Sequence, residues 1–225
     1  MENSLSYKLI RSRRRSVALV VARDATLVVR APLRMPLYFI EAFLEERRDW
    51  VDRTVARVRE ENIHVLKRRY LDGEYFRFLG VEYPLRMVES ASRPLLFESG
   101  EFRLFQHSRH RARSLFAAWY RREVRRILEE RTALISNQHG LRPGRISIKD
   151  MRSRWGSCGP DGSLNFNMRL VMAPLSVIDY VVAHELAHLL HRDHSRIFWD
   201  MVAMMHPNYQ QDRRFLSKNG HLLEF

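Results

Sequence analysis

The most informative stretch of this chain for its fold is His184-Glu-Leu-Ala-His188, which His194 follows. Two histidines at positions i and i+4 of a helix lie about 40° apart around its axis and ~6 Å apart along it. Their imidazoles can converge on one ion at Zn–N distances of ~2.0–2.1 Å. Glu185 points away from this ligand pair but can reach a metal-bound water. The spacing therefore predicts a metal site that carries its own general base.

The flanking residues predict that the motif lies on a buried helix. Residues 177–183 and 186–190 are almost all apolar, and a helix that is apolar all round is buried. Pro174 and Ser176 supply a helix start and an N-cap. Buried histidines need polar partners, and a shared metal ion is one that this motif can provide.

The third ligand is expected to be His194. In a continuing helix it would lie ~9 Å beyond His188 and on another face, so the helix must stop after about Leu190. Arg192-Asp193 is the predicted break that lets the chain fold back. A second helix is predicted over residues 196–205, which a proline follows.

Alternatives to a catalytic zinc site stay open at this point. His191 competes for the third place, although three ligands spread over ~10 Å of straight helix cannot all converge. The histidines can also stack in the core without a metal. A closed structural zinc site needs a fourth protein ligand, for which Cys158 is the one thiol of the chain. Three nitrogens and an open position describe a catalytic zinc, which is the interpretation we favour.

Further motifs extend over nearly the whole chain and resemble one known family. They are Leu79-Gly-Val-Glu-Tyr83, Ile146-Ser-Ile-Lys-Asp150, Ser153-Arg-Trp-Gly-Ser-Cys158, Leu164-Asn-Phe-Asn167, Met172-Ala-Pro174, Val177-Ile-Asp-Tyr-Val181, Asp193-His-Ser195 and Phe198-Trp199. Together with the histidine motif they resemble the YgjP-like zinc metallopeptidases, relatives of the SprT-like proteins. The resemblance is densest over residues 146–209. It implies a zincin-type domain in which His184, His188 and His194 hold one zinc ion and Glu185 is the general base.

The order of apolar and turn-forming residues predicts an α+β fold in two parts. The first, residues 1–110, is a smaller α+β region with a β-hairpin of strands at 16–22 and 26–30, a helical stretch at 37–60 and short strands between 73 and 106. The second, residues 111–225, is the zincin-like metallopeptidase domain. It is expected to contain a long helix at 111–138, strands at 145–150 and 164–170 around a glycine-rich loop, the motif helix and a C-terminal helix.

Substrate-binding residues are expected around the metal. They are Arg152, Arg154, Asn165 and Tyr209. Candidates for stabilising the oxyanion are Tyr209, His206 and Arg154. Gly156 and Gly159 are expected to turn the loop tightly through positive φ. By resemblance to the zincins, the strand at 164–168 is expected to pair with an extended peptide.

Composition predicts a soluble cytoplasmic protein. With 45% hydrophobic residues, 225 residues suffice for one core or two small ones. A single cysteine excludes an internal disulfide framework and suits a reducing compartment. No apolar run approaches the ~20 residues of a membrane span, and the apolar run at 17–22 is too short for a signal peptide. The sequence predicts no particular oligomeric state.

Charge is the second signal. The chain has 39 lysines and arginines against 26 acidic residues, a formal charge of +13. The excess lies in Arg11–Arg15, Arg47–Arg59, Lys67–Arg69, Arg109–Arg113 and Arg121–Arg126. Such fields attract nucleic acid or other polyanions through counterion release. Each cluster alone is also explained as a solvated helix face with Arg–Glu pairs. Weak, non-specific nucleic-acid or polyanion binding is therefore a hypothesis about partners.

Three functions are compatible with these observations. We favour a zinc-dependent metallopeptidase that cleaves extended or unfolded polypeptide by metal-activated water, with Glu185 as general base. A metal-dependent nucleotide or phosphate hydrolase is the first alternative, with arginines as phosphate clamps. Against it, three histidines and one glutamate lack the carboxylate-rich arrangement usual for that chemistry. The second alternative is a nucleic-acid-associated protein with a SprT-like protease role.

Overall fold

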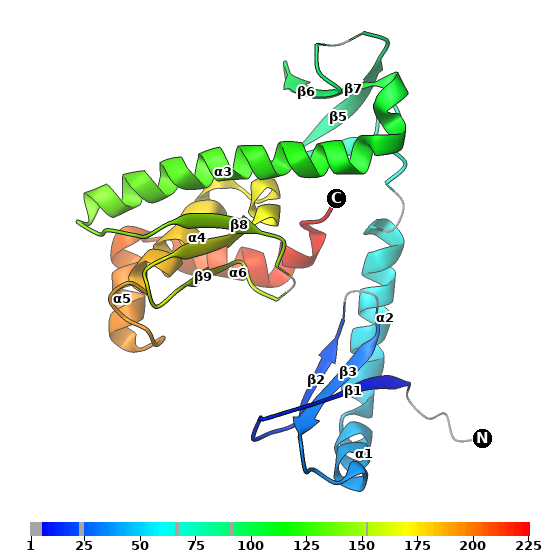
Figure 1. Cartoon of the computed structure of the whole chain (residues 1–225), viewed down its shortest axis with the longest axis vertical. Coiled ribbons are helices and arrows are strands. Elements are labelled where there is room, and N and C mark those ends of the chain that lie inside the picture. Colours follow the sequence, from blue (N-terminus) through cyan, green and yellow to red (C-terminus); the bar gives the residue numbers. More distant parts are fainter. Residues whose placement is uncertain (1–5, 23–24, 66–67, 91, 152) are drawn as a thin grey trace. The chain divides into compact units, whose positions relative to one another are not determined.

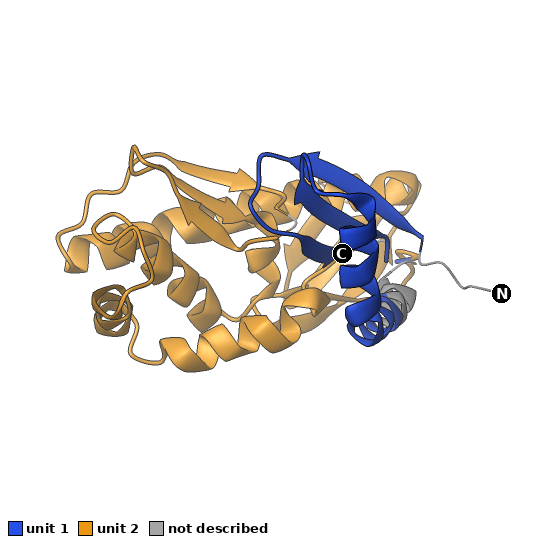
Figure 2. Ribbon diagram, turned by 90° about the horizontal axis from the view of Figure 1, so that it is seen from below, with its two compact units in different colours: residues 1–68 blue, residues 69–225 orange. Residues whose placement is uncertain are grey.

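The computed structural model describes residues 6–22, 25–65, 68–90, 92–151 and 153–225. The chain folds as two compact units, residues 1–68 and 69–225, each of which is described by itself (Figure 2). The units thus divide at residue 69 and not at residue 110, where the sequence placed the boundary. The physical reason is an aromatic core that joins side chains from both sides of residue 110. Phe76 stacks on Phe116 with ring centroids 4.1 Å apart, and Phe102 packs edge-on against Trp119 at 4.9 Å.

The first unit combines a three-stranded sheet with two helices. Its strands, in the order β1-β3-β2, are β1 (Tyr7–Ser12), β2 (Ala18–Val21) and β3 (Leu27–Pro32). The expected hairpin is confirmed, because β2 and β3 pair antiparallel. Strand β1 pairs parallel to β3 and has no counterpart in the sequence-based expectations. Two helices, α1 (Leu37–Glu46) and α2 (Arg48–Val65), replace the single predicted stretch, since the chain leaves helical geometry at Arg47 (φ −107°, ψ 13°).

The second unit begins with a four-stranded sheet and a long helix. The strands, in the order β4-β5-β7-β6, are β4 (Tyr75–Phe78), β5 (Val81–Val88), β6 (Leu95–Glu98) and β7 (Glu101–Phe105). A 3-10 helix, η1 (Gln106–Arg111), leads into α3 (Ala112–Gln138). The short strands and the long helix confirm the prediction for this region. The Tyr120 hydroxyl of α3 donates to the Arg77 carbonyl of β4 at 2.8 Å, which ties the helix to the sheet.

A second, smaller sheet and three more helices follow α3. The strands, in the order β8-β10-β9, are β8 (Ile146–Lys149), β9 (Gly156–Cys158) and β10 (Leu164–Asn167). The remaining elements are η2 (Met168–Met172), α4 (Leu175–Ala187), α5 (Arg196–Met205), α6 (Tyr209–Asn219) and η3 (Gly220–Leu222). Figure 1 shows α4 and this sheet alongside α3. The fold is mixed α+β, as expected, and α5 has the predicted bounds.

Strand β10 lies in the middle of its sheet. It pairs parallel with β8 on one side and antiparallel with β9 on the other. The expectation that residues 164–168 pair with a peptide is therefore wrong, because the backbone groups on both edges of β10 are already hydrogen-bonded. Strands β8 and β9 are the two edges of this sheet, and β9 is the edge that contacts α4.

Helix α4 is the central element of the second unit. It is buried over most of its length, which follows from its nearly continuous apolar sequence. Asp179, on its partly exposed side, accepts two hydrogen bonds from Arg131 of α3, at 2.6 and 2.8 Å. Ser176 does not cap the helix as predicted, since Pro174 occupies the N-cap position and the Ser176 hydroxyl donates to Asp212 at 3.0 Å. No helix among the described residues is long and apolar enough to cross a membrane.

Candidate metal centre

The turn after α4 brings His194 back towards the motif. Helix α4 ends at Ala187, and the amides of Leu189 and Leu190 bond to carbonyls three residues earlier, which tightens the last turn. The chain then reverses before α5. As a result, the Nε2 atoms of His194 and His184 lie 3.2 Å apart.

Three imidazoles face one another at this turn. One ligand atom from each of His184, His188 and His194 lies within 4.8 Å of the other two, and the ring centroids are 4.8 to 5.1 Å apart. Two nitrogens on a tetrahedral zinc ion are separated by about 3.3 Å at the usual Zn–N distance, close to the separation of the His184 and His194 nitrogens. Among the described residues, the convergent donor group contains no cysteine. The donor set therefore fits zinc with an open coordination position.

Aromatic packing and one hydrogen bond orient the imidazoles. Phe198 of α5 is fully buried, and its ring centroid lies 4.6 to 5.0 Å from all three histidine rings. The Nδ1 atom of His188 donates to the His191 carbonyl at 2.9 Å, which leaves Nε2 as the free acceptor. The Nδ1 atom of His184 is buried without a partner among the described residues, so ring packing and the contact with His194 hold that imidazole.

The surroundings of His184 and His188 favour the neutral form of the imidazole. Burial is the main reason why the pKa of His184 is lowered to about 3, and the neighbouring His188 and His194 contribute to this decrease. Burial also lowers the pKa of His188. Neutral imidazole is the form that binds a metal ion, so these two side chains need not lose a proton at neutral pH.

Glu185 is a buried carboxyl group next to this cluster. Its side chain is 4% exposed, and its Oε2 atom has no hydrogen-bond partner among the described residues. Burial raises the pKa of Glu185, and with the opposing effect of the positive charge of Arg154 included the pKa is about 8. A buried carboxyl group with a free oxygen and a pKa near neutrality is suited to accept and release a proton.

Gly156 of β9 makes room for Glu185. A Cβ atom at this position would lie 2.5 Å from Oε1 of Glu185 and 2.7 Å from its Cγ atom. Neither Gly156 nor Gly159 adopts positive φ, so the predicted reason for these glycines is wrong. At Gly156 the requirement is space, because the edge strand runs directly against the carboxyl group.

Two side chains hold the loops around the centre. Asn167 is buried, and its amide donates to the carbonyls of Met151 and Arg154 at 2.7 and 3.0 Å. Arg192, in the turn after α4, donates to the carbonyls of Gly159 and Pro160 at 2.8 and 3.2 Å. The sequence did not identify either role, because both depend on partners that are distant in the chain.

The predicted substrate-binding residues have different surroundings. Arg154 is exposed in the loop before β9, and its charge acts on Glu185. Tyr209 stacks on Trp199 at 5.4 Å, and the Trp199 ring lies 5.7 Å from that of His184. Asn165 donates to Ser157 at 3.4 Å across the small sheet. Arg152 lies outside the described residues.

The remaining candidates take part in other contacts. His206 faces Asp212 at 2.6 Å, and Asp212 is buried and also accepts from Ser176. His191 contributes its backbone carbonyl to His188, and its side chain is not part of the convergent group. Burial raises the pKa of the Cys158 thiol, which keeps it in the unreactive protonated form.

Comparisons with known proteins agree with a metal-dependent hydrolytic site. The family model described as YgjP-like, metallopeptidase domain, matches residues 15–219, a range that includes every residue of the centre. No curated protein matches the chain. The crystal structure of the metallopeptidase zymogen of Pyrococcus abyssi abylysin is 21% identical over 40% of this chain and 93% of that chain, with a TM-score of 0.38. A likeness of that size carries no information about the site.

Proposed function

The chain belongs to the YgjP-like metallopeptidase family, and from this premise we propose that it is a zinc-dependent peptidase that cleaves extended or unfolded polypeptide. The observation that carries the proposal is the convergence of three imidazoles beside a buried carboxyl group with a free oxygen. His184, His188 and His194 would hold the ion. Zinc bound there would supply Lewis acidity, which polarises a peptide carbonyl and makes water easier to deprotonate.

The protein's own part in the chemistry is proton transfer. Oε2 of Glu185 is free to take a proton from the attacking water and to pass it to the leaving amine nitrogen. Burial keeps bulk water away from this carboxyl group, so the proton that it holds is available to the substrate. A divalent cation next to Glu185 would favour its ionised form, which is the form needed to accept the first proton.

We place the substrate along β9. Among the described strands, this edge strand pairs on one side only, and its first residue, Gly156, lies against Glu185. An extended peptide that adds to β9 would bring its own carbonyl groups next to the centre. Arg154 and Tyr209 are the proposed side-chain contacts, because the charge of Arg154 acts on Glu185 and Tyr209 stacks on Trp199. Asn165 is less suited, since its amide already bonds to Ser157.

The test is turnover by the zinc-loaded full chain on an unfolded, labelled polypeptide, compared with its Glu185→Gln variant. We expect the variant to keep its zinc and to lose about 10³-fold in rate, because it cannot accept a proton. A nucleotide panel, with phosphate release as the readout, is the control for the other hydrolase class. Peptide cleavage that does not depend on Glu185, or Glu185-dependent phosphate release without peptide cleavage, would contradict the proposal.

A further inference from the structure

Positive charge is concentrated where η1 joins α3. Between Glu101 and Glu123 the chain has no acidic residue. Within positions 107–113, five of seven residues are basic: His107, Arg109, His110, Arg111 and Arg113. All five side chains are exposed. The start of α3 adds the positive end of the helix dipole, and no side chain caps it.

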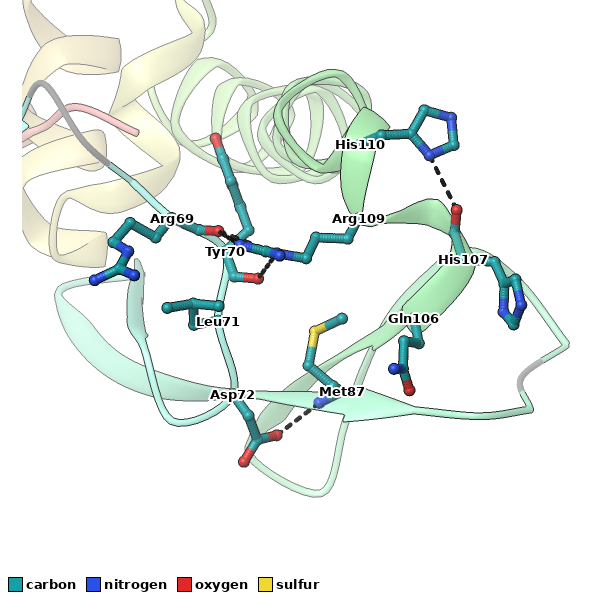
Figure 3. Close-up of a pocket in the computed structure, with 9 residues that line it drawn as sticks. All are labelled: Arg69, Tyr70, Leu71, Asp72, Met87, Gln106, His107, Arg109 and His110. Atoms are coloured by element: carbon teal, nitrogen blue, oxygen red, sulfur yellow. Dashed lines mark hydrogen bonds between the residues drawn. The ribbon is translucent and has the colours of Figure 1, made fainter.

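A depression of about 780 Å³ lies next to this segment. Figure 3 shows Arg109 lying across it towards the backbone of Arg69 and Tyr70. The guanidinium of Arg109 donates to the Arg69 carbonyl at 3.0 Å and to the Tyr70 carbonyl at 3.2 Å. These contacts bring Arg69 beside the basic segment. We call Arg69, His107, Arg109, His110, Arg111 and Arg113 the basic patch.

Among the residues that the structure describes, no acid pairs with the arginines of the basic patch. Arg109 bonds to carbonyl groups, which are uncharged. Arg69, Arg111 and Arg113 form no ion pair with any described acidic residue. Asp72 is the acid that lines the depression, and it faces Arg86 at 3.5 Å and accepts the Met87 amide at 2.8 Å.

Three arginines further along α3, beyond Arg121, behave differently. Arg122, Arg125 and Arg126 each lie within 3.4 Å of a glutamate on the same helix. Their charges are therefore largely compensated, as expected for a solvated helix face. The paired arginines of α3 are therefore explained by solubility alone, whereas the basic patch retains a net positive charge.

We propose that the basic patch binds the phosphate backbone of a nucleic acid. Its strong cations are all arginines, whose planar forks match phosphate oxygens bidentately. The surface is concave, and Leu71 and Met87 line it between the charges. The His107 ring stacks on Phe105 at 5.2 Å, which provides a flat face beside the arginines for a base. This combination favours nucleic acid over an acidic polypeptide, which offers no bases to stack.

The test measures binding of the zinc-loaded full chain to a labelled oligonucleotide of about 20 nucleotides, single-stranded or duplex, by fluorescence anisotropy. With four arginines engaged, we expect log K to fall with log salt at a slope of about −3 for the single strand. In the triple variant Arg69→Gln, Arg111→Gln, Arg113→Gln, the magnitude of this slope is expected to decrease by about 2. Its affinity near 0.1 M salt should fall at least about tenfold. Arg109 is left unchanged because it supports the backbone at residues 69–70.

The matched control is Arg122→Gln, Arg125→Gln, Arg126→Gln, which removes the same charge from paired positions of α3. It is expected to change affinity by less than about threefold. The single change Arg111→Glu serves if the triple variant does not fold, and should weaken binding about tenfold. Equal losses in patch and control variants would show that net charge alone acts. Unchanged binding in the patch variants, or equally tight binding of polyglutamate, would also overturn the proposal.

Discussion

Gly156 contributes to the candidate centre by lacking a side chain. The strand that carries it runs against Glu185, and the carboxyl group occupies the space in which a Cβ atom would stand. Glu185 is buried, so it cannot move aside into solvent. The position of the proposed base is therefore determined by the strand opposite as well as by its own helix.

Gly156→Ala is expected to lower peptidase activity about 10²-fold while zinc binding persists, because it displaces Glu185 and not the histidines. Gly159→Ala is the matched control. Its Cβ atom would meet Asp161 Oδ1 and Ser163 Oγ, side-chain ends in the loop before β10 that can shift. Equal activity of the two variants in the same turnover assay would show that the close approach of Gly156 to Glu185 does not affect peptidase activity.

The raised pKa of Glu185 predicts how the stability of the metal-free protein depends on pH. The native state holds the proton up to about pH 8, whereas the unfolded chain releases it near 4.5. The free energy of unfolding should therefore fall as pH rises through this window. Glu185→Gln removes that dependence, so we expect the variant to be more stable than the wild type at pH 8 by about 2–4 kcal/mol.

Denaturant unfolding in the presence of a chelator checks this, with the two proteins compared at pH 5 and pH 8. The lowered pKa of His184 has the opposite effect at acid pH, but both proteins share it and it cancels in the comparison. A stability difference that is the same at both pH values would contradict the prediction.

Metal content distinguishes the two histidines that compete for the third ligand position. His194→Ala should lose zinc, because it removes one of three converging nitrogens. His191→Ala should keep it, since His191 supports the centre through its backbone carbonyl, which alanine retains. Elemental analysis of both variants after dialysis gives the answer, and the reverse pattern would refute the ligand set.

At the scale of elements, a partly buried ion pair links α4 to α3 in addition to their apolar packing. Arg131 and Asp179 are 23% and 15% exposed, and the two hydrogen bonds run from Nε and Nη2 to the two carboxylate oxygens. Hydrogen bonding to Asp179 raises the pKa of Arg131 above its ordinary value. This ion pair stabilises the fold more than a surface pair would, because water competes less for its hydrogen bonds.

Asp179→Ala should therefore destabilise the second unit by about 2–3 kcal/mol, because it leaves the Arg131 charge partly buried without its partner. Arg125→Ala is the control, since the Arg125–Glu129 pair is about half exposed on both sides and should cost no more than ~0.5 kcal/mol. Chemical denaturation of both variants measures the difference. Similar costs would mean that the pair does not secure α4.

At the scale of the whole molecule, the two units have separate cores. One hydrophobic cluster lies within residues 7–55, and the other begins at Tyr70 and ends at Phe225. Each unit buries its own apolar side chains and can in principle fold alone. All residues of the candidate centre belong to the second unit.

We expect a fragment of residues 69–225 to fold and to bind one zinc ion with the affinity of the full chain. Circular dichroism during heating and zinc titration provide the measurement. The fragment should melt cooperatively, within a few degrees of the corresponding transition of the full chain. A fragment that binds ANS and melts without a transition would show that the units depend on each other.

Local signals were enough to predict several elements. Helices α3 and α5 follow from their apolar periodicity and from the proline and glycine residues that end them. The hairpin β2–β3 follows from two β-rich runs joined by a short turn. Strand β1 and the central place of β10 could not be predicted in the same way, because parallel pairing joins residues that are far apart in the chain.

The sequence was enough to predict the family, which the family model shows, and to propose the metal donors and the base, because HExxH spacing on a helix is a local property of 3.6 residues per turn. Tertiary structure alone decided which strand faces Glu185, why Gly156 must lack a side chain, and how Asn167 and Arg192 hold the surrounding loops. It also distinguished Arg111 and Arg113, which form no ion pair with the described acidic residues, from Arg122, Arg125 and Arg126, which do. These features depend on distances between residues that are remote in sequence, and such distances exist only after the chain has packed.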